Sequence, residues 1–133
     1  NSIRISGQWE PRITSLVADL PENSVFLDVG ANIGWHTLVA LSLGHTVHAF
    51  EPLAENVEMI RHSMCLNPGL GSKLHLRTTA LSDSATSSLG CSIASPLDNE
   101  GNGQLRCGEE AQNRGGNDRE GRAVMLQTLD TSI

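Results

Sequence analysis

The chain has 133 residues and a net charge of −6, because 15 acidic residues outnumber 9 basic ones. This charge and the lack of a basic cluster argue against nucleic acid or an anionic membrane as the main partner. No apolar run approaches the roughly 18 residues of a transmembrane helix, and a hydrophobic content of 38% is enough for the core of one modest domain.

Alternating helix and strand signals predict an α/β fold for the first part of the chain. Helices are expected at 11–20, 33–43 and 53–66, and strands at 24–29, 46–50 and 73–79. The apolar run at 24–29 is typical of a buried parallel strand, whereas 73–79 alternates in polarity, as strands near a sheet edge do. The pattern predicts a Rossmann-like three-layer sandwich with strand order 3-2-1, right-handed crossovers and helices on both faces.

The composition changes at residues 82–122, which are polar and contain six glycines between positions 98 and 122. Such a stretch buries too little apolar surface to offset the entropy of ordering, so we expect a flexible loop. Short strands at 88–94 and 123–128 are expected to flank it as a hairpin-like insertion.

A glycine-rich turn follows the first strand. The strand segment Val-Phe-Leu-Asp-Val (25–29) is followed by the turn Gly-Ala-Asn-Ile-Gly (30–34). Together they have the layout of strand, turn and helix start that is typical of nucleotide-binding sites. Gly30 allows the tight turn, and Asn32 tolerates a left-handed backbone. Gly34 has no side chain and would let a ligand approach the N–H groups at the start of the next helix.

Glu51 stands 21 residues after Gly30, at the end of the second strand. A carboxylate in this place can accept two hydrogen bonds from ribose hydroxyls. The alternative is an exposed acid that the dipole of the following helix stabilises. We interpret Glu51 as the ribose-binding residue of a cofactor site.

The residues around the turn discriminate between cofactors. Trp35 occupies the third glycine position of a dinucleotide fingerprint, and no Gly-Lys-Ser/Thr of a phosphate loop follows. Asp28, at the carboxyl end of its strand, suits a cationic ligand such as the ammonium and sulfonium of S-adenosylmethionine. Its alternative role is to hold the loop through backbone N–H groups, and the two roles are compatible.

These residues resemble motifs I and II of class I S-adenosylmethionine-dependent methyltransferases, and more narrowly the FkbM-like methyltransferase family. Four blocks in the family's order carry the resemblance: Asp-Val-Gly-Ala-Asn-Ile-Gly-Trp-His-Thr-Leu (28–38), Ala-Phe-Glu-Pro (49–52) with Glu55-Asn56, Ala-Leu-Ser-Asp (80–83) and Leu-Gln-Thr-Leu-Asp (126–130). The resemblance implies methyl transfer from S-adenosylmethionine, usually to oxygen on a small molecule or a sugar.

The resemblance also implies a set of cofactor-binding residues. It places Asp28, Gly30, Ala31, Asn32 and Gly34 around the amino-acid and ribose parts of the cofactor. It places Glu51 at the ribose hydroxyls and Ala80 and Leu81 against the adenine. Trp35 and Pro52 complete the set. Trp35 is equally well interpreted as a packing residue.

The catalytic base is not identified by any motif. A hydroxyl acceptor needs a base near the methyl donor, and His36 is the only histidine near that end. A lone histidine is more often structural, so His36 is a weak candidate. Trp9 and Glu10, just before the first helix, are candidates to close over the cofactor.

One departure from the family matters. There the Thr-Leu-Asp block is followed by a strand with a Lys-x-Asp-x-Glu-Gly-type motif and the rest of the sheet, which this sequence does not contain. We therefore divide it into a cofactor-binding half (1–81), the insertion (82–122) and a strand (123–130) leading to the missing half. Its first strand would expose an apolar edge, so we expect the missing strands to come from the rest of the native chain or from a partner.

Two other classes of function remain open. One is a catalytically silent methyltransferase-like module that mediates interactions within a larger assembly. The other is a nucleotide-dependent oxidoreductase, against which Trp35 argues. The methyl acceptor cannot be identified beyond a small-molecule or saccharide class.

The three cysteines, Cys65, Cys91 and Cys107, are an odd number without Cys-x-x-Cys spacing, so no metal site is predicted. Reduced thiols in an intracellular, reducing compartment are the favoured interpretation. The alternative is a Cys91–Cys107 disulfide that closes the insertion in an oxidising compartment.

Overall fold

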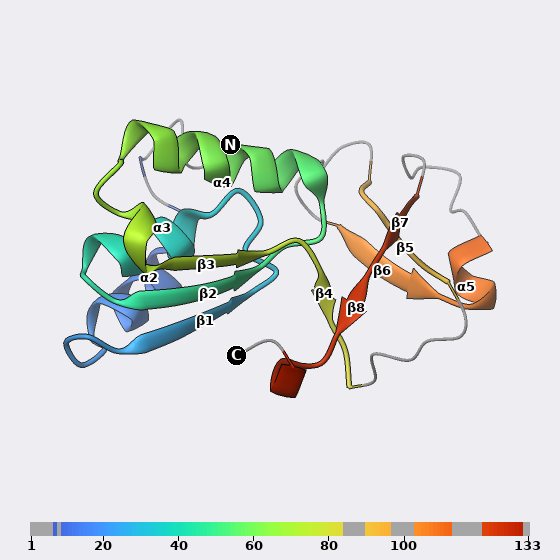
Figure 1. Cartoon of the computed structure of the whole chain (residues 1–133), viewed down its shortest axis with the longest axis horizontal. Coiled ribbons are helices and arrows are strands. Elements are labelled where there is room, and N and C mark those ends of the chain that lie inside the picture. Colours follow the sequence, from blue (N-terminus) through green and yellow to red (C-terminus); the bar gives the residue numbers. More distant parts are fainter. Residues whose placement is uncertain (1–6, 8, 84–89, 97–102, 113–120, 132–133) are drawn as a thin grey trace.

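The structure is a computed structural model that describes residues 7, 9–83, 90–96, 103–112 and 121–131. Its first unit is a parallel sheet of β1 (Val25–Val29), β2 (Thr46–Phe50) and β3 (Leu74–Arg77), ordered β1-β2-β3. Helices α2 (Pro11–Ala18), α3 (Trp35–Ser42) and α4 (Ala54–Leu66) alternate with these strands, and the short helix η1 (Gly71–Lys73) precedes β3 (Figure 1). The predicted Rossmann-like α/β fold and strand order 3-2-1 are confirmed.

The apolar core lies on one face of this sheet. Its buried members are Val17, Ala31, Ala40, Leu41, Val47, Ala49 and Ile60, which come from all three helices and from the turn and strand between them. The described helices α2, α3 and α4 therefore cover the same face, and the prediction of helices on both faces is not met in these residues. The reason is geometric: right-handed crossovers that advance in one direction across a parallel sheet put successive helices on the same side.

The opposite face of β1 is open in the described part of the chain. Successive strand residues point to opposite faces, so Phe26 and Asp28 turn toward the core. Val25, Leu27 and Val29 turn away from it and are 60%, 40% and 62% exposed. β1 is also the outer strand of the three-stranded sheet, so it carries the apolar, uncovered surface that the sequence predicted.

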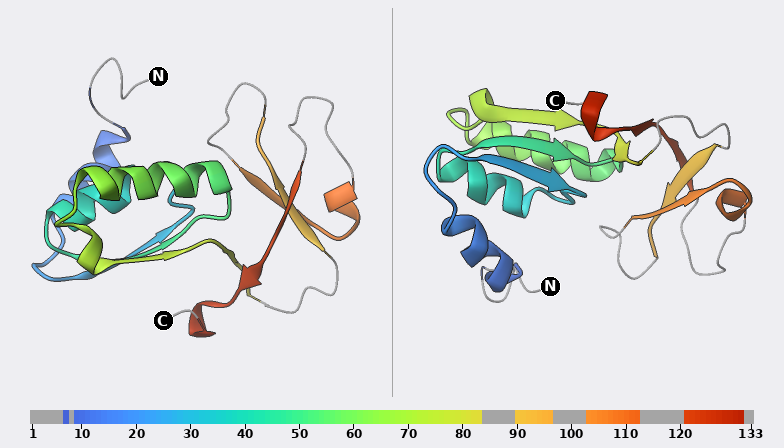
Figure 2. Two further views of the ribbon diagram at one scale, coloured as in Figure 1. Left: turned by 45° about the horizontal axis from the view of Figure 1, so that its top comes forward. Right: turned by 90° about the horizontal axis from the view of Figure 1, so that it is seen from below.

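A second, antiparallel unit lies beyond the carboxyl ends of the parallel strands (Figures 1 and 2). The chain reaches it through β4 (Ala80–Leu81), which pairs in parallel with β8 (Leu126–Gln127). The antiparallel sheet contains β5 (Cys91–Ala94), β6 (Gln104–Cys107) and β7 (Arg122–Val124) in the order β6-β5-β7. The short helices α5 (Glu109–Gln112) and η2 (Leu129–Thr131) complete the described elements.

The insertion was predicted as a hairpin-like excursion, and its flanking strands are confirmed. The stretch between 98 and 122, expected to be loop, contains β6 and α5. The physical reason is that β6 pairs along its whole length with β5, and a disulfide joins Cys91 to Cys107 at the end of this pairing. The remainder of the predicted flexible loop lies outside the described residues.

The disulfide also corrects the expectation of three reduced thiols. Cys91 and Cys107 are paired, whereas Cys65 is free and exposed. The reducing compartment remains a prediction, and this disulfide argues against it. Within the ranges that the structure describes, no helix is long and apolar enough to cross a membrane.

Candidate functional site

The turn between β1 and α3 is held closely by the protein itself. Its backbone has positive φ at Gly30 (77°), Asn32 (55°) and Gly34 (87°), as the predicted left-handed turn requires. The N–H groups of Gly30 and Ala31 donate to the Phe50 carbonyl at 2.9 and 3.1 Å.

The other N–H groups of this turn are used in the same way. The Asn32 N–H donates to Glu51 Oε2 at 2.7 Å, the Ile33 N–H to Asn32 Oδ1 at 2.8 Å, and the Gly34 N–H to the Ala31 carbonyl at 2.9 Å. All five backbone N–H groups of residues 30–34 therefore have partners within the protein. A phosphate-binding loop needs N–H groups that point at the ligand instead.

Glu51 is buried, with 4% of its surface exposed, so the alternative of an exposed helix-start acid is wrong. Its Oε2 accepts from Asn32, its Oε1 accepts the Leu53 N–H at 2.8 Å, and the Asn56 side chain also bonds to this carboxylate. Burial raises the pKa of Glu51, and these hydrogen bonds oppose the shift. Glu51 thus ties the turn to the end of β2, and these three bonds leave one of the roughly four acceptor positions of its carboxylate for a ligand.

Asp28 lies beneath the same turn and is 9% exposed. Its Oδ2 accepts a 2.6 Å hydrogen bond from Thr37 Oγ1 on α3. Burial raises the pKa of Asp28, whereas the bonds from Thr37 and the nearby His36 ring oppose the rise. The carboxylate therefore joins the strand to the following helix.

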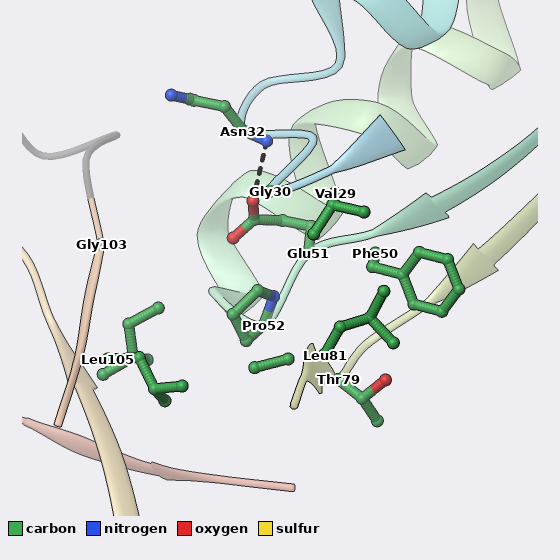
Figure 3. A pocket seen from close by; sticks show the side chains of 12 residues that line it. Val29, Gly30, Asn32, Phe50, Glu51, Pro52, Thr79, Leu81, Gly103 and Leu105 are labelled. Atoms are coloured by element: carbon green, nitrogen blue, oxygen red, sulfur yellow. Dashed lines mark hydrogen bonds between the residues drawn. The ribbon is translucent and has the colours of Figure 1, made fainter. Parts of the chain in front are cut away.

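A cavity of about 260 Å³ opens where the parallel strands end (Figure 3). Its lining includes six predicted site residues: Gly30, Asn32, Glu51, Pro52, Ala80 and Leu81. The sequence missed the rest of the lining, which is Val29, Phe50, Thr79, Ile93, Gly103 and Leu105. The first three stand directly before predicted site residues at strand ends, so their position gave a usable signal. The last three belong to the insertion, where nothing in the sequence pointed to a cavity.

A second cavity of about 390 Å³ adjoins the glycine turn and shares Gly30 and Asn32 with the first. It is lined by Trp9, Glu10, Asp28, Gly30, Ala31, Asn32, Ile33, Trp35 and His36. Two carboxylates and two indoles in one lining are groups that attract a cation, by charge and by the negative face of the ring.

Trp35 and His36 connect this second cavity to the segment before α2. The Trp35 Nε1–H donates to Thr14 Oγ1 at 3.1 Å, so Trp35 both packs on α2 and lines the cavity. His36 Nε2 lies 3.0 Å from Glu10 Oε2, and Glu10 itself has a positive φ of 42°. His36 Nδ1 is buried and has no hydrogen-bond partner among the described residues.

Gly34 is the one predicted cofactor-binding residue that lines neither cavity. A Cβ at this position would lie 2.7 Å from Ile60 Cγ1, so the space beside Gly34 is filled by α4. The structure therefore explains this glycine through helix packing and its backbone conformation.

No family model matches the sequence, and no significant match to a curated protein was found. The fold is similar to the crystal structure of methyltransferase FkbM from Methylobacillus flagellatus KT, with a TM-score of 0.51 and 13% sequence identity. The alignment covers 87% of this chain and 25% of that protein, so the chain spans about a quarter of its length. The chain thus has an FkbM-like methyltransferase fold, as the sequence motifs predicted.

Proposed function

We propose that this chain is the cofactor-binding part of an S-adenosylmethionine-dependent methyltransferase that methylates oxygen on a small molecule or a sugar. The observation that carries this proposal is the pair of cavities that share Gly30 and Asn32 of the glycine turn. One cavity contains the buried Glu51, and the other contains Asp28 and Glu10. A nucleoside joined to a cationic amino acid needs these two environments side by side.

The hydrogen bonds of the turn favour this cofactor over a phosphate-containing one. The N–H groups of residues 30–34 are all used internally, so this turn offers none of them to a pyrophosphate. Carboxylates would also repel phosphates and attract an ammonium and a sulfonium. These two properties argue against a nicotinamide dinucleotide and therefore against the oxidoreductase alternative.

The residues of each cavity have distinct parts in this proposal. Glu51 accepts the ribose hydroxyls, one at its remaining acceptor position and the other in place of one of its present hydrogen bonds, and Pro52, Ala80 and Leu81 form an apolar surface for the adenine. Asp28 and the turn at Gly30 and Ala31 hold the amino-acid end.

S-adenosylmethionine supplies an electrophilic methyl group, to which the acceptor oxygen bonds as the carbon–sulfur bond breaks. The protein's task is to align the acceptor and to remove its proton at or near that moment. His36 is the candidate to take this proton, and Glu10, 3.0 Å from its Nε2, is placed to orient the ring.

The open face of β1 supports the proposal that further strands complete the sheet. Val25 and Val29 are 60% and 62% exposed, which is costly for a strand in water. A strand from the rest of the native chain or from a partner would pair with the free edge of β1, and elements packed on the completed sheet would cover these two side chains. We expect the isolated chain to self-associate in analytical ultracentrifugation and a Val25→Lys, Val29→Lys variant to stay monomeric. A monomeric wild-type chain would rule out this part of the proposal.

Calorimetric titration tests the cofactor assignment. We expect the protein to bind S-adenosylhomocysteine with one-to-one stoichiometry and to show no heat of binding with NAD. Binding of NAD alone would favour an oxidoreductase. Binding of neither compound, by a protein that is folded by circular dichroism, would favour a catalytically silent interaction module.

A further inference from the structure

The first cavity has walls from two different parts of the fold. Glu51, Pro52 and Leu81 belong to the parallel sheet and its extension, whereas Ile93, Gly103 and Leu105 belong to the antiparallel insertion. In Figure 3, Leu105 lies across the hollow from Pro52 and Leu81. The cavity is therefore a gap between the two units, and the insertion supplies three of its twelve lining residues.

We propose that the antiparallel insertion forms the outer wall of the nucleobase subsite, with Leu105 as a residue that contacts the base. This inference rests on the proposed function. Leu105 is 40% exposed although it lines the cavity, so its apolar surface is available for a ligand to cover. Because Leu81 and Pro52 lie opposite Leu105, the cavity has apolar groups on two sides. This arrangement suits a flat aromatic base and does not favour a sugar or a phosphate.

Several contacts hold this wall against the parallel unit. A Cβ at Gly103 would lie 2.8 Å from Leu53 Cδ1 and 2.6 Å from Ile93 Cδ1, so a larger residue at this position would require these side chains to move. On the outside, Arg122 of β7 makes a 2.5 Å ion pair with Glu55 of α4. The insertion is thus attached directly to the segment that follows Glu51.

The disulfide fixes the strand pair that carries the wall. Cys91 lies opposite Cys107, and two residues along the same pairing Ile93 lies opposite Leu105. The covalent link therefore sets the register at which Ile93 and Leu105 enter the cavity. Loss of the link should loosen the apolar side of the subsite and leave Glu51 unchanged.

The test uses two probes that differ at the amino-acid end. 5′-Methylthioadenosine contains the base and ribose without the amino acid, whereas S-adenosylhomocysteine contains all three parts. We expect Leu105→Ala to weaken both probes by the same factor, about fivefold, as for the loss of roughly 40 Å² of apolar contact. Gln104→Ala, the neighbouring exposed position on β6, is the matched control and should leave both affinities unchanged.

Each outcome is decisive. Unchanged affinities in Leu105→Ala, with the wild type binding both probes, would overturn the assignment of the wall. Weaker binding of S-adenosylhomocysteine alone would also overturn it, because Leu105 would then contact the amino-acid end. A wild-type protein that binds neither probe would instead remove the proposed function.

A second pair of variants keeps the inference testable if Leu105→Ala fails to fold. Replacement of both Cys91 and Cys107 by Ser should lower the affinity for 5′-methylthioadenosine at least as much as Leu105→Ala does. Cys65→Ser, at the free and exposed cysteine, is the control and should have no effect. Equal affinity in the double variant and the wild type would contradict the role of the insertion as a wall.

Discussion

The parallel unit and the antiparallel insertion are stabilised in different ways. In the parallel unit Val47, Ala49 and Ile60 are fully buried in a core whose buried residues come from three helices, the glycine turn and β2. In the insertion the buried apolar residues that the structure describes are Cys91 and Ile93, and a disulfide takes the place of a core. Small units with little apolar surface commonly depend on such a cross-link.

The cavity between the two units is therefore lined by segments that are stabilised in two different ways. The side with Glu51 depends on core packing and a hydrogen-bond network, whereas the side with Leu105 depends on strand pairing and one covalent bond. Changes to the core should therefore act on the whole protein, and changes to the disulfide should act on the insertion. The following substitutions test this difference.

Ile60→Ala should have the largest effect on stability. Ile60 is fully buried between α4 and the sheet, and removal of such a side chain costs about 2–5 kcal/mol. Urea denaturation followed by circular dichroism should show a single transition at a much lower midpoint. The control is Met59→Ala, 53% exposed on the same helix, which should cost less than about 1 kcal/mol. Equal costs for the two variants would disprove the core on this face.

Removal of the disulfide should destabilise the insertion alone. Cys91 and Cys107 are 16 residues apart, and closing a loop of this length contributes about 3 kcal/mol. Hydrogen exchange in the Cys91→Ser, Cys107→Ser variant should become faster in β5 and β6 and stay unchanged in β1 and β2. Faster exchange in both units would show that they are not stabilised independently.

Gly34→Ala should destabilise the parallel unit by about 2–3 kcal/mol, because it combines a left-handed backbone with overpacking. Gly44→Ala is a matched control, since Gly44 has the same φ of 87° but nothing within 4 Å of an added Cβ. The difference between the two variants, measured by urea denaturation, isolates the contact with Ile60. If both variants cost the same, the packing explanation for Gly34 is wrong.

Asp28→Asn should have the smallest effect on stability, and its sign depends on pH. Burial raises the pKa of Asp28, so the folded protein holds this proton more tightly than the unfolded chain does. The bound proton on Asp28 therefore stabilises the folded state at low pH, and this stabilisation is lost as pH rises through the folded-state pKa of Asp28. The asparagine variant, which can still accept from Thr37, avoids that loss.

The variant should therefore gain stability over the wild type as pH rises above about 4, the ordinary pKa of an aspartate. The exposed Asp19→Asn is the control and should show no comparable gain. A gain that is the same at every pH would contradict the role of ionisation. The same Asp28→Asn variant should bind S-adenosylhomocysteine more weakly, because it removes a partner of the ammonium.

The parallel unit could be predicted because its apolar residues follow the periods of helices and buried strands. β1, β2 and α4 differ from their predicted ranges by one residue at most, since each has a continuous apolar face that the core requires. The side of the sheet that the helices cover was mispredicted, although strand order and crossover handedness together determine it.

The insertion could be predicted only in outline. Strand β6 contains a single large apolar residue, Leu105, so its sequence shows no alternation of apolar and polar residues. Its pairing with β5 depends on contacts between residues that are distant in sequence. For the same reason Ile93, Gly103 and Leu105 gave no signal as cavity residues. In the turn, Asp28 and Glu51 were recognised as site residues, but their hydrogen bonds to Thr37 and Asn32 became visible only in three dimensions.

The most direct test of the account is the affinity of the Glu51→Ala variant for S-adenosylhomocysteine, measured by calorimetry beside the wild type and Glu58→Ala. Glu58 is an exposed acid on α4 that pairs with Arg61, so its replacement controls for the loss of one charge. Hydrogen bonds to a charged group contribute about 1.5–3 kcal/mol, so we expect Glu51→Ala to bind about 10- to 150-fold more weakly. Glu58→Ala should bind like the wild type. Unchanged binding in a folded Glu51→Ala variant would contradict the assignment of Glu51 to the ribose, and with it the cofactor site proposed at the glycine turn.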